Sequence, residues 1–538
     1  MARLLLSTRS LRRLLYLVVI WICLCYLVFH FTRPLNAVSL LADHVQRGLL
    51  EKSVSKQLVN NNIAFQFSKE NPQVDTSPSL GEKEFLYFLS NNSNLPLAYW
   101  AANKNKQIGD KTCVKFPSLY DLEFNNIYWQ SFHSSNGTFY LYGAYYDDRW
   151  RGGSLPSVRI LGMVDRLKPH PTICQLWFDK LKSPLFSPVT YTYAWHTKWG
   201  NYKNNILQPY VISCKIPKES KGQVPASVSL VERNCQKPSC NLRVVNNRPV
   251  RKQDFAVCVK GLDFLQNDLS VRLVEWLELL RAVGAKKVFL YELEIHPNIS
   301  KVLHYYHNQG FVQLTPITLP GNQPNLPGFR HLYLKSKLTN KRQNELIPYN
   351  DCLYRNLYSY EYLVLLDIDE FILPVKHDTW GELMKVVVSK ALQEKNYTRA
   401  SYNVRNVYFL DDLKDGEELQ HETHEKGIPS YLHMLQHVYR SKNFTKAGSY
   451  VKCFHNTERA VSLHNHFPLN CFGTCTTYSI STDLAHLQHY RKDCVGTLKN
   501  SCKSDFKVYT TRDTAIWKYK DTVIRQSTLV LKKLGFFP

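Results

Sequence analysis

The spacing of apolar positions changes several times along the chain, and each change marks the border of a predicted unit. Residues 14–31 form one unbroken apolar run without Lys, Arg, Asp or Glu. As a helix, this run spans about 27 Å, which is enough to cross a thin membrane. We therefore predict a transmembrane helix, acting as a signal anchor, at 14–31, after a cytosolic tail at 1–13. The polar, Asn- and Ser-rich residues 32–104 are typical of a stem.

Short apolar runs that alternate with polar residues fill the region 105–248. Each run is bounded by Gly, Pro, Asn or Ser, and no helical period separates one run from the next. This pattern predicts a mostly β, sandwich-like domain. Its strands are expected in FYLYGAYYDD, SVRILGMV, TICQLWF, VTYTYAWH and YVISCKI.

A βαβαβ series begins at about residue 254. The expected order is strand DFAVCVKGL, helix VRLVEWLELLRAVGAKK, strand KVFLYELE, helix NISKVLHYYHNQG, strand FVQLTPITL, helix NELIPYNDCLYRNLYSY and strand EYLVLLDIDEFIL. Such alternation predicts a Rossmann-type α/β domain, over 249–500, whose parallel sheet binds ligands beyond the carboxyl ends of its strands. Residues 501–538 are then a C-terminal extension.

The net charge and the expected membrane topology indicate the partners and the compartment of these domains. The chain has 68 Lys and Arg against 44 Asp and Glu, a net charge of +24. Because the basic residues are spread along the chain, we expect no nucleic-acid partner. Four arginines precede the apolar run at 14–31, so the body of the chain is expected in the lumen, as in a single-pass type II membrane protein. A cleaved signal peptide is the alternative, but its apolar run is usually shorter.

Cysteines and glycosylation sequons agree with a lumenal body. Twelve of the 14 Cys follow the apolar run, and in an oxidising compartment they predict disulfides. Cys258 and Cys352 are left open as buried thiols, and zinc at Cys471 and Cys475 is the weaker alternative to a disulfide there. Disulfides are expected among Cys113, Cys174, Cys214, Cys235 and Cys240, and among Cys453, Cys471, Cys475, Cys494 and Cys502. Glycosylated surface loops are expected at the sequons of Asn91, Asn136, Asn298, Asn396 and Asn443.

A D-x-D motif, Asp367 and Asp369, follows the apolar run 362–366. Carboxylates at i and i+2 on an extended chain point to the same side, and their oxygens suit a hard divalent cation, Mn²⁺ or Mg²⁺. Neither the glycine-rich dinucleotide fingerprint nor a P-loop occurs in the sequence. We therefore expect the acidic pair to hold a metal ion that grips a diphosphate.

Several motifs resemble glycosyltransferase family 92. They are Phe255–Lys260, LVEWLELLRAVGAKKVFLYE, NDCLYR at Asn350–Arg355, LLDIDEF at Leu365–Phe371 and the late His489–Arg491, together with YYDDR at Tyr145–Arg149 ahead of the catalytic domain. The resemblance implies a glycosyltransferase-A-like catalytic domain in a type II Golgi membrane protein. It also implies inverting transfer of galactose from UDP-galactose in β1,4 linkage. The implied acceptor is a terminal sugar of glycoprotein N-glycans, with β-galactose as first choice and fucose as second.

Further side chains are candidates for the rest of the site. Asp411 and Asp412, after the apolar NVYFL, are candidate bases for the acceptor hydroxyl, although a solvated turn explains them equally well. Glu370 is a third candidate, more naturally a support for the metal pair. His464 is the expected additional metal ligand. The expected diphosphate ligands are Lys260, His489 and Arg491.

Three other classes of protein also carry paired acids. A glycoside hydrolase needs two carboxylates about 5 to 9.5 Å apart that face each other across a sugar, which neighbours in one turn do not provide. A dehalogenase-like phosphatase expects Thr or Val at 371, where this chain has Phe. A non-catalytic lumenal glycan-binding protein, in which the D-x-D motif serves only structure, stays open as an alternative.

Overall fold

The computed structural model describes residues 94–103, 113–149, 155–179, 181–413, 426–494 and 496–537. All of them belong to the unit Pro78–Pro538. The predicted cytosolic tail, the membrane anchor and most of the predicted stem lie outside the described residues, as does Asn91. None of the described helices is long and apolar enough to span a bilayer.

The β-rich domain is a mostly antiparallel sheet whose strands close into a ring. The strand order is β1-β2-β3-β4-β7-β6-β5-β8-β9, and β9 also pairs with β3. The bounds are β1 Phe124–Asn126, β2 Trp129–Ser134, β3 Gly137–Asp147, β4 Ser157–Val164, β5 Ile173–Trp177, β6 Leu185–Tyr193, β7 Gln208–Lys215, β8 Ser227–Val231 and β9 Leu242–Val245. The five predicted strands are confirmed as β3 to β7.

The prediction of a sandwich is wrong in its connectivity. Two separate sheets would leave free edges, whereas β6 pairs with β5 through Leu185–Pro188 and with β7 through Val189–Tyr193. One bent strand thus serves both halves of the sheet. Ala144 and Tyr145 of β3 pair with β9 and close the ring after a register shift in β3. The result is closer to a barrel, in which fewer strand edges are exposed.

The predicted parallel sheet is confirmed in the second domain. Its seven strands have the order β12-β11-β10-β13-β18-β15-β21, and the first four are parallel. These four are β10 Gln253–Phe264, β11 Lys287–Ile295, β12 Val312–Pro316 and β13 Tyr360–Leu365, and the last three are β15 Ser401–Val404, β18 Lys452–Asn456 and β21 Thr477–Ser479. The connecting helices include α5 Ser270–Ala282, α6 Pro297–Asn308, α7 Pro327–Ser336, α8 Leu338–Asn344 and α9 Leu346–Arg355.

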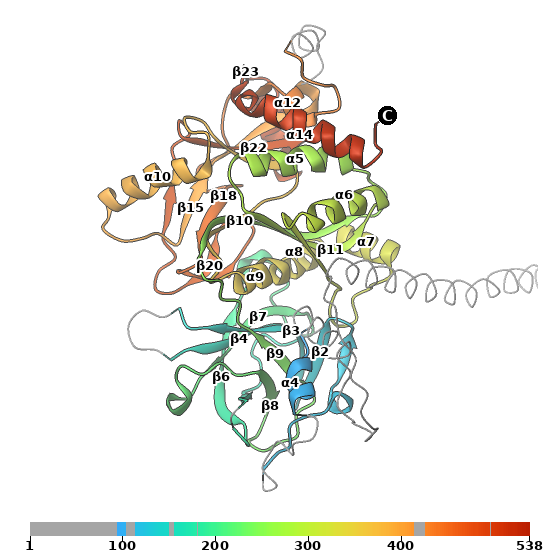
Figure 1. Cartoon of the computed structure of the whole chain (residues 1–538), viewed down its shortest axis with the longest axis vertical. Coiled ribbons are helices and arrows are strands. Elements are labelled where there is room, and N and C mark those ends of the chain that lie inside the picture. The colour runs from blue at the N-terminus through green and yellow to red at the C-terminus, as the bar shows by residue number, and fades with distance from the viewer. Residues whose placement is uncertain are drawn as a thin grey trace, which may run out of the picture. The chain divides into compact units, whose positions relative to one another are not determined.

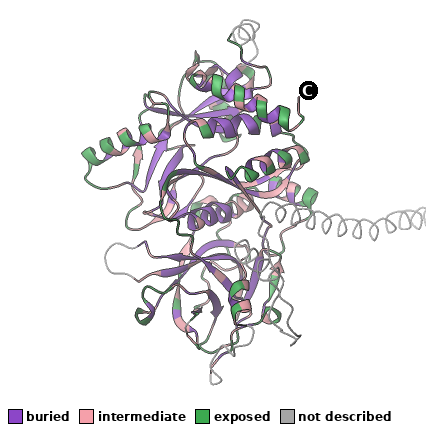
Figure 2. Ribbon diagram, in the orientation of Figure 1, coloured by how far each residue is buried: buried purple, intermediate pink, exposed green. Residues whose placement is uncertain are grey.

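Alternate residues of β10 serve two different cores. Val257 and Val259 pack in the core that contains α5 and α6. Ala256 and Cys258 pack in a second core, which α9 shares with the β-rich domain. Figure 1 shows α5 and α9 on opposite sides of the sheet, and Figure 2 shows that the strands between them are buried. Burial on both faces explains why the centre of β10, Phe255–Val259, is continuously apolar.

A smaller sheet extends the domain on the far side of the D-x-D motif. The predicted strand at 361–373 is divided, because the motif forms a turn between β13 and β14. The small sheet has the order β14-β22-β16, with bounds Glu370–Pro374, Ala485–Arg491 and Asn406–Leu410. The remaining elements include α10 Trp380–Glu394, α12 His433–Gln436, β17 Tyr439–Ser441, β19 Ala460–Leu463, β20 Pro468–Cys471, β23 Thr510–Arg512 and α14 Lys520–Lys533.

The C-terminal residues complete the catalytic domain rather than extend it. Val523 and Leu531 of α14 are buried in the same core as α5. Similarly, α4, Leu97–Ala102, at the end of the predicted stem, touches the β-rich domain through a bond from Trp100 Nε1 to the carbonyl of Pro117. The two outer boundaries predicted from sequence therefore fall inside packed structure.

Disulfides connect most of the cysteines in the described residues. The pairs are Cys113–Cys235, Cys174–Cys214, Cys258–Cys352, Cys471–Cys475 and Cys494–Cys502. Cys258 and Cys352, left open as thiols, are bonded and join β10 to α9. Conversely, Cys240 and Cys453 were expected in disulfides but are buried free thiols.

A buried polar cluster, here called the clasp, joins the two domains. Tyr145 of the YYDDR motif donates to Asp351 of the NDCLYR motif, as does Tyr291 at 2.6 Å. The guanidinium of Arg355 lies 2.9 Å from the same carboxylate. Farther along the motif, Arg149 pairs with Asp147 at 2.9 Å and donates to backbone carbonyls of the catalytic domain. Two of the motifs that carried the family resemblance are therefore structural.

Candidate active site

A cavity of about 640 Å³ lies at the carboxyl ends of the parallel strands. Lys260 of β10 and Asp367, just after β13, line it. The cavity falls where a doubly wound sheet presents its ligands, and its volume is within the usual range for ligand pockets, about 300–1,000 Å³. Of the predicted site residues, Lys260, Asp367, His464, His489 and Arg491 all line this cavity.

Asp367 is already surrounded by ammonium groups. Its carboxylate lies 3.1 Å from Lys260 Nζ and 3.6 Å from Lys452 Nζ, and Lys452 is fully buried. Burial raises the pKa of Asp367, but the two lysines outweigh this effect and hold the pKa well below its ordinary value. Lys452 also binds Glu370 at 2.9 Å. Asp367 is therefore a fixed anion, largely neutralised by its neighbours.

Asp369 has a different environment, because its nearest charged partner is an imidazole. Its carboxylate lies 3.4 Å from His489 Nε2, and its side chain is 41% exposed, against 20% for Asp367. The other ring nitrogen of His489 lies 3.2 Å from the side-chain oxygen of Asn406. An amide oxygen only accepts, so Nδ1 carries a proton, and Nε2 is the ring nitrogen that can bind a cation beside Asp369.

The pair Asp369 and His489 therefore offers ligand atoms for a divalent ion. Among the described residues, the buried Nε2 of His489 has no hydrogen-bond partner. Carboxylate oxygen and imidazole nitrogen together suit Mn²⁺ better than Mg²⁺, which prefers oxygen ligands only. The antiparallel pairing of Glu370 with His489 in β14 and β22 brings the histidine next to the motif. This donor set fits a metal ion.

His464 occupies another part of the cavity wall. Its ring lies 4.6 Å from that of Trp199 and 5.1 Å from that of Phe467. Burial lowers the pKa of His464 to about 3, so the ring is neutral. The histidine in contact with Asp369 is His489, at 3.4 Å, and the metal role of His464 stays a prediction.

The β-rich domain contributes an aromatic edge to this cavity. Trp195 and Trp199 both line it, and their rings meet edge to face at 5.0 Å. Trp195 precedes a short 3₁₀ turn, Thr197–Trp199, that follows β6, and Trp199 is the last residue of that turn. Trp195 is buried, whereas Trp199 is half-buried. Sequence reasoning missed this role, because an aromatic residue in a β-rich domain is more often part of its core.

Basic side chains dominate the remaining wall. Arg491 ends β22, while Lys341 and Arg342 come from α8, and all three line the cavity with Lys260. Their combined charge makes the cavity a favourable site for an anion.

Asp411 and Asp412, the predicted bases, are not among the cavity-lining residues. They begin a 3₁₀ turn directly after β16, which directs the chain away from the sheet edge. Asp411 lies 3.1 Å from His437 Nε2, and Asp412 pairs with Lys507. The contact with His437 lowers the pKa of Asp411 to about 2. The structure therefore gives these two carboxylates other partners.

Besides Asp367, two carboxylates do line the cavity, Glu345 and Glu370. Glu370 is buried against Lys452, and burial raises its pKa. Glu345 lies between α8 and α9, 3.5 Å from Lys260 Nζ, its closest ion-pair contact among the described residues. Nothing in the surrounding sequence distinguishes Glu345 from other helical surface acids.

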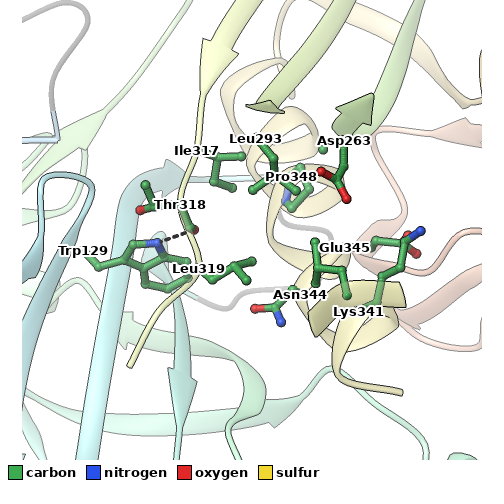
Figure 3. A pocket seen from close by; sticks show the side chains of 12 residues that line it. Trp129, Asp263, Leu293, Ile317, Thr318, Leu319, Lys341, Asn344, Glu345 and Pro348 are labelled. Atoms are coloured by element: carbon green, nitrogen blue, oxygen red, sulfur yellow. Dashed lines mark hydrogen bonds between the residues drawn. The ribbon is translucent and has the colours of Figure 1, made fainter. Parts of the chain in front are cut away.

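A smaller recess, about 30 Å³, adjoins the large cavity. Figure 3 shows Asp263, Lys341 and Glu345 on one side of it and Trp129 on the other, where Trp129 Nε1 donates to the carbonyl of Thr318. A volume of this size holds only one or two water molecules. Glu345 and Lys341 are shared by both hollows, so the recess connects the site to the ends of β10 and β11.

Comparisons with known proteins identify the family. The model of glycosyltransferase family 92 matches residues 253–527. The chain belongs to glycosyltransferase family 92. The match begins with β10 and ends within α14, so it includes Lys260, Asp367 and His489 but neither Trp195 nor Trp199.

Other comparisons add little to this family 92 assignment. No curated protein matches the chain. One solved structure, the apo form of the bifunctional glycosyltransferase WbbM, has 14% sequence identity and a TM-score of 0.17. The likeness covers 32% of this chain and only 27% of that one.

Proposed function

We propose that this family 92 glycosyltransferase transfers galactose from UDP-galactose, with inversion, to a terminal sugar of glycoprotein N-glycans in β1,4 linkage. Terminal β-galactose is the first choice of acceptor and fucose the second. The observation that supports the proposal best is the single cavity that combines Asp367 of the D-x-D motif, the imidazole of His489, which lies 3.4 Å from Asp369, and several basic groups. The proposed setting is the Golgi lumen, behind a type II membrane anchor, and the disulfides of the lumenal body are consistent with it.

Asp369 and His489 are the proposed metal ligands, with Mn²⁺ as the preferred ion. When bound, the ion would neutralise negative charge that develops on the leaving diphosphate. Lys260, already within 3.1 Å of Asp367, holds that acid in place. Arg491, together with the basic residues of α8, is proposed to bind the phosphate oxygens directly.

Glu345 is the proposed base in place of Asp411 and Asp412. Of the three carboxylates in the cavity, Asp367 and Glu370 have lysine contacts of 3.1 and 2.9 Å, while the contact of Glu345 is longer at 3.5 Å. Glu345 is therefore the acid most available to accept a proton. The acceptor hydroxyl loses its proton to Glu345, its oxygen bonds to the anomeric carbon, and the bond from that carbon to the diphosphate breaks with inversion.

Trp199 is the proposed platform for the acceptor sugar. It is half-buried at the cavity wall and has one ring face against His464. Aromatic rings bind the apolar face of a sugar by stacking, and a rigid tryptophan loses little entropy when it does so. The β-rich domain would thereby take part in the choice of acceptor.

A donor and acceptor panel tests the proposal. A secreted form beginning at residue 34 should release UDP from UDP-galactose only when Mn²⁺ and a galactose- or fucose-terminated N-glycan are present, and product analysis should show a β1,4 bond. Release from another nucleotide sugar alone would correct the donor. Glycan binding without any turnover would instead support the alternative of a non-catalytic lumenal glycan-binding protein.

A further inference from the structure

Three metal-ligating side chains meet outside the catalytic cavity. Asp411 follows β16, while His433 and His437 lie in and just after α12. Their ligand atoms, one from each residue, all lie within 4.8 Å of one another. The carboxylate oxygen of Asp411 is 3.1 Å from His437 Nε2 and 3.8 Å from His433 Nε2. None of the three lines the large cavity.

The hydrogen bond of His437 to a backbone carbonyl indicates which of its ring nitrogens carries a proton. Its Nδ1 lies 2.6 Å from the backbone carbonyl of His433. A carbonyl only accepts, so Nδ1 must carry a proton. In a neutral ring, Nε2 then presents a lone pair to the carboxylate oxygen of Asp411, and two acceptors would face each other at 3.1 Å. Either a second proton on the ring or a cation must lie between them.

The backbone around the two histidines is held firmly before any cation binds. The carboxylate of Glu275, fully buried in α5, accepts the backbone N–H groups of Met434 and Leu435 at 2.9 Å. The indole of Trp517 donates to the carbonyl of Leu435, also at 2.9 Å. Metal-binding histidines usually donate their other ring proton to a carbonyl or carboxylate, as His437 does. The site is therefore built in the manner of a metal centre.

We propose that Asp411, His433 and His437 bind a zinc ion. Two ligands on a tetrahedral zinc at about 2.1 Å lie about 3.4 Å apart. The observed separations of 3.1 and 3.8 Å lie on either side of that value. Two imidazoles and one carboxylate are common zinc ligands, and water can complete the shell, because the Asp411 side chain is 33% exposed.

Another acid–histidine contact in the chain, between Asp513 and His486, belongs to an ordinary ion cluster and serves as a comparison. Asp513 lies 3.6 Å from His486, but Arg440 already binds the same oxygen at 2.7 Å. That carboxylate has a resident cation and only one imidazole. The cluster at Asp411 has two imidazoles, one of which has its tautomer fixed by a carbonyl.

The zinc would act on the shape of the catalytic cavity. Leu410, the residue before Asp411, pairs with Arg491, and Tyr408 of the same strand stacks on His489 at 5.5 Å. A zinc ion that links Asp411, directly after β16, to the histidines in and just after α12 would hold this strand in position against His489. We therefore expect the metal to stabilise the fold and to leave the choice of donor unchanged.

Metal analysis of the full chain, solubilised in detergent and stripped with a chelator, tests the proposal. Titration with zinc chloride should give about one tightly bound ion per chain, with a dissociation constant below about 1 µM, and a higher unfolding temperature. His433→Gln and His437→Gln should each weaken zinc binding at least about tenfold.

Two control variants locate the ion. Asp369→Asn should keep the zinc, since it alters only the cavity, so failure of the proposed transferase would not affect this result. His133→Ala removes an exposed histidine 3.5 Å from Glu123 and should also keep it.

Two results would overturn the proposal. The first is a folded wild-type chain that takes up no zinc, which would leave His437 as a protonated partner of Asp411. The second is zinc that is lost in Asp369→Asn but kept in the histidine variants. If the histidine variants fail to fold, Asp411→Asn, at a more exposed position, provides the same comparison.

Discussion

The clasp and the catalytic site both contain aspartates close to cationic groups. Only the catalytic site has a carboxylate with a position left for a ligand. In the clasp, Asp351 has no exposed surface, and two tyrosines and one arginine satisfy it. At the cavity, His489 lines the wall, and Asp369, whose side chain is 41% exposed, lies 3.4 Å from its Nε2. Both acids belong to motifs that resemble the same family, so sequence alone does not separate their roles.

The comparison shows that a structural carboxylate has all of its hydrogen bonds and ion pairs made within the protein, whereas a functional carboxylate has a position left for a ligand. A buried carboxylate whose bonds are all made can only lose stability when it is altered. A carboxylate beside an unpartnered nitrogen has room for a ligand, and its replacement should affect binding and leave the fold intact. A substitution in the clasp should therefore lower stability, and a substitution at the catalytic site should lower metal binding and activity.

The largest effect is expected for Asp369→Asn. Removal of one metal ligand should lower transfer by at least about 10³-fold, because charge on the leaving diphosphate is no longer neutralised. The unfolding temperature should stay close to that of the wild type. The matched control is Asp521→Asn, whose side chain is 88% exposed, and it should keep full activity. Equal turnover in both variants would remove Asp369 from the site.

Asp351→Asn should produce the opposite pattern. Loss of the charge leaves Arg355 buried without its anion, which should cost about 3–5 kcal/mol of the free energy of unfolding. Chemical denaturation and secretion yield would measure this. Activity per folded molecule should be unchanged, and a loss of turnover without a loss of stability would place the clasp in the mechanism.

A smaller effect is expected for Glu345→Gln. Removal of the proposed base should lower kcat about 10²-fold or more, with little change in the KM for UDP-galactose. The acidic limb of the pH profile should also disappear, which a merely structural role for Glu345 would not cause. Should Glu370→Gln remove that limb while Glu345→Gln keeps it, Glu370 is the base.

The smallest effect is expected for Trp199→Ala. Loss of the stacking surface should raise the KM for the acceptor glycan about tenfold, which corresponds to about 1.4 kcal/mol. The KM for UDP-galactose should be unaffected. Phe472→Ala, also aromatic but stacked on Arg149 in the clasp, serves as the control, and an equal rise in acceptor KM there would argue against a specific platform.

Local patterns predicted the elements of the catalytic domain, whereas long-range pairing decided the details of its site. The parallel order of β10 to β13 and the position of Asp367 followed from apolar runs and a turn. The sequence could not distinguish His464 from His489, because both are late histidines after apolar residues. The pairing of Glu370 with His489, which lie far apart in sequence, brings His489 next to the motif.

The other differences between prediction and structure also arise from contacts between segments that are far apart in sequence. The pairing of Cys258 with Cys352 joins positions that sequence spacing cannot relate. Trp199 reaches the cavity only because the two domains pack together, and Asp411 leaves it because a 3₁₀ turn follows β16. In each case the missing information was which segments meet, and not which residues have the required chemistry.

Binding of Mn²⁺ in the presence of UDP, followed by electron paramagnetic resonance, tests the central claim most directly. We predict that the wild type and His464→Gln bind one Mn²⁺ per chain in a UDP-dependent manner, and that Asp369→Asn and His489→Gln do not. Loss of binding in His464→Gln together with normal binding in His489→Gln would contradict the account.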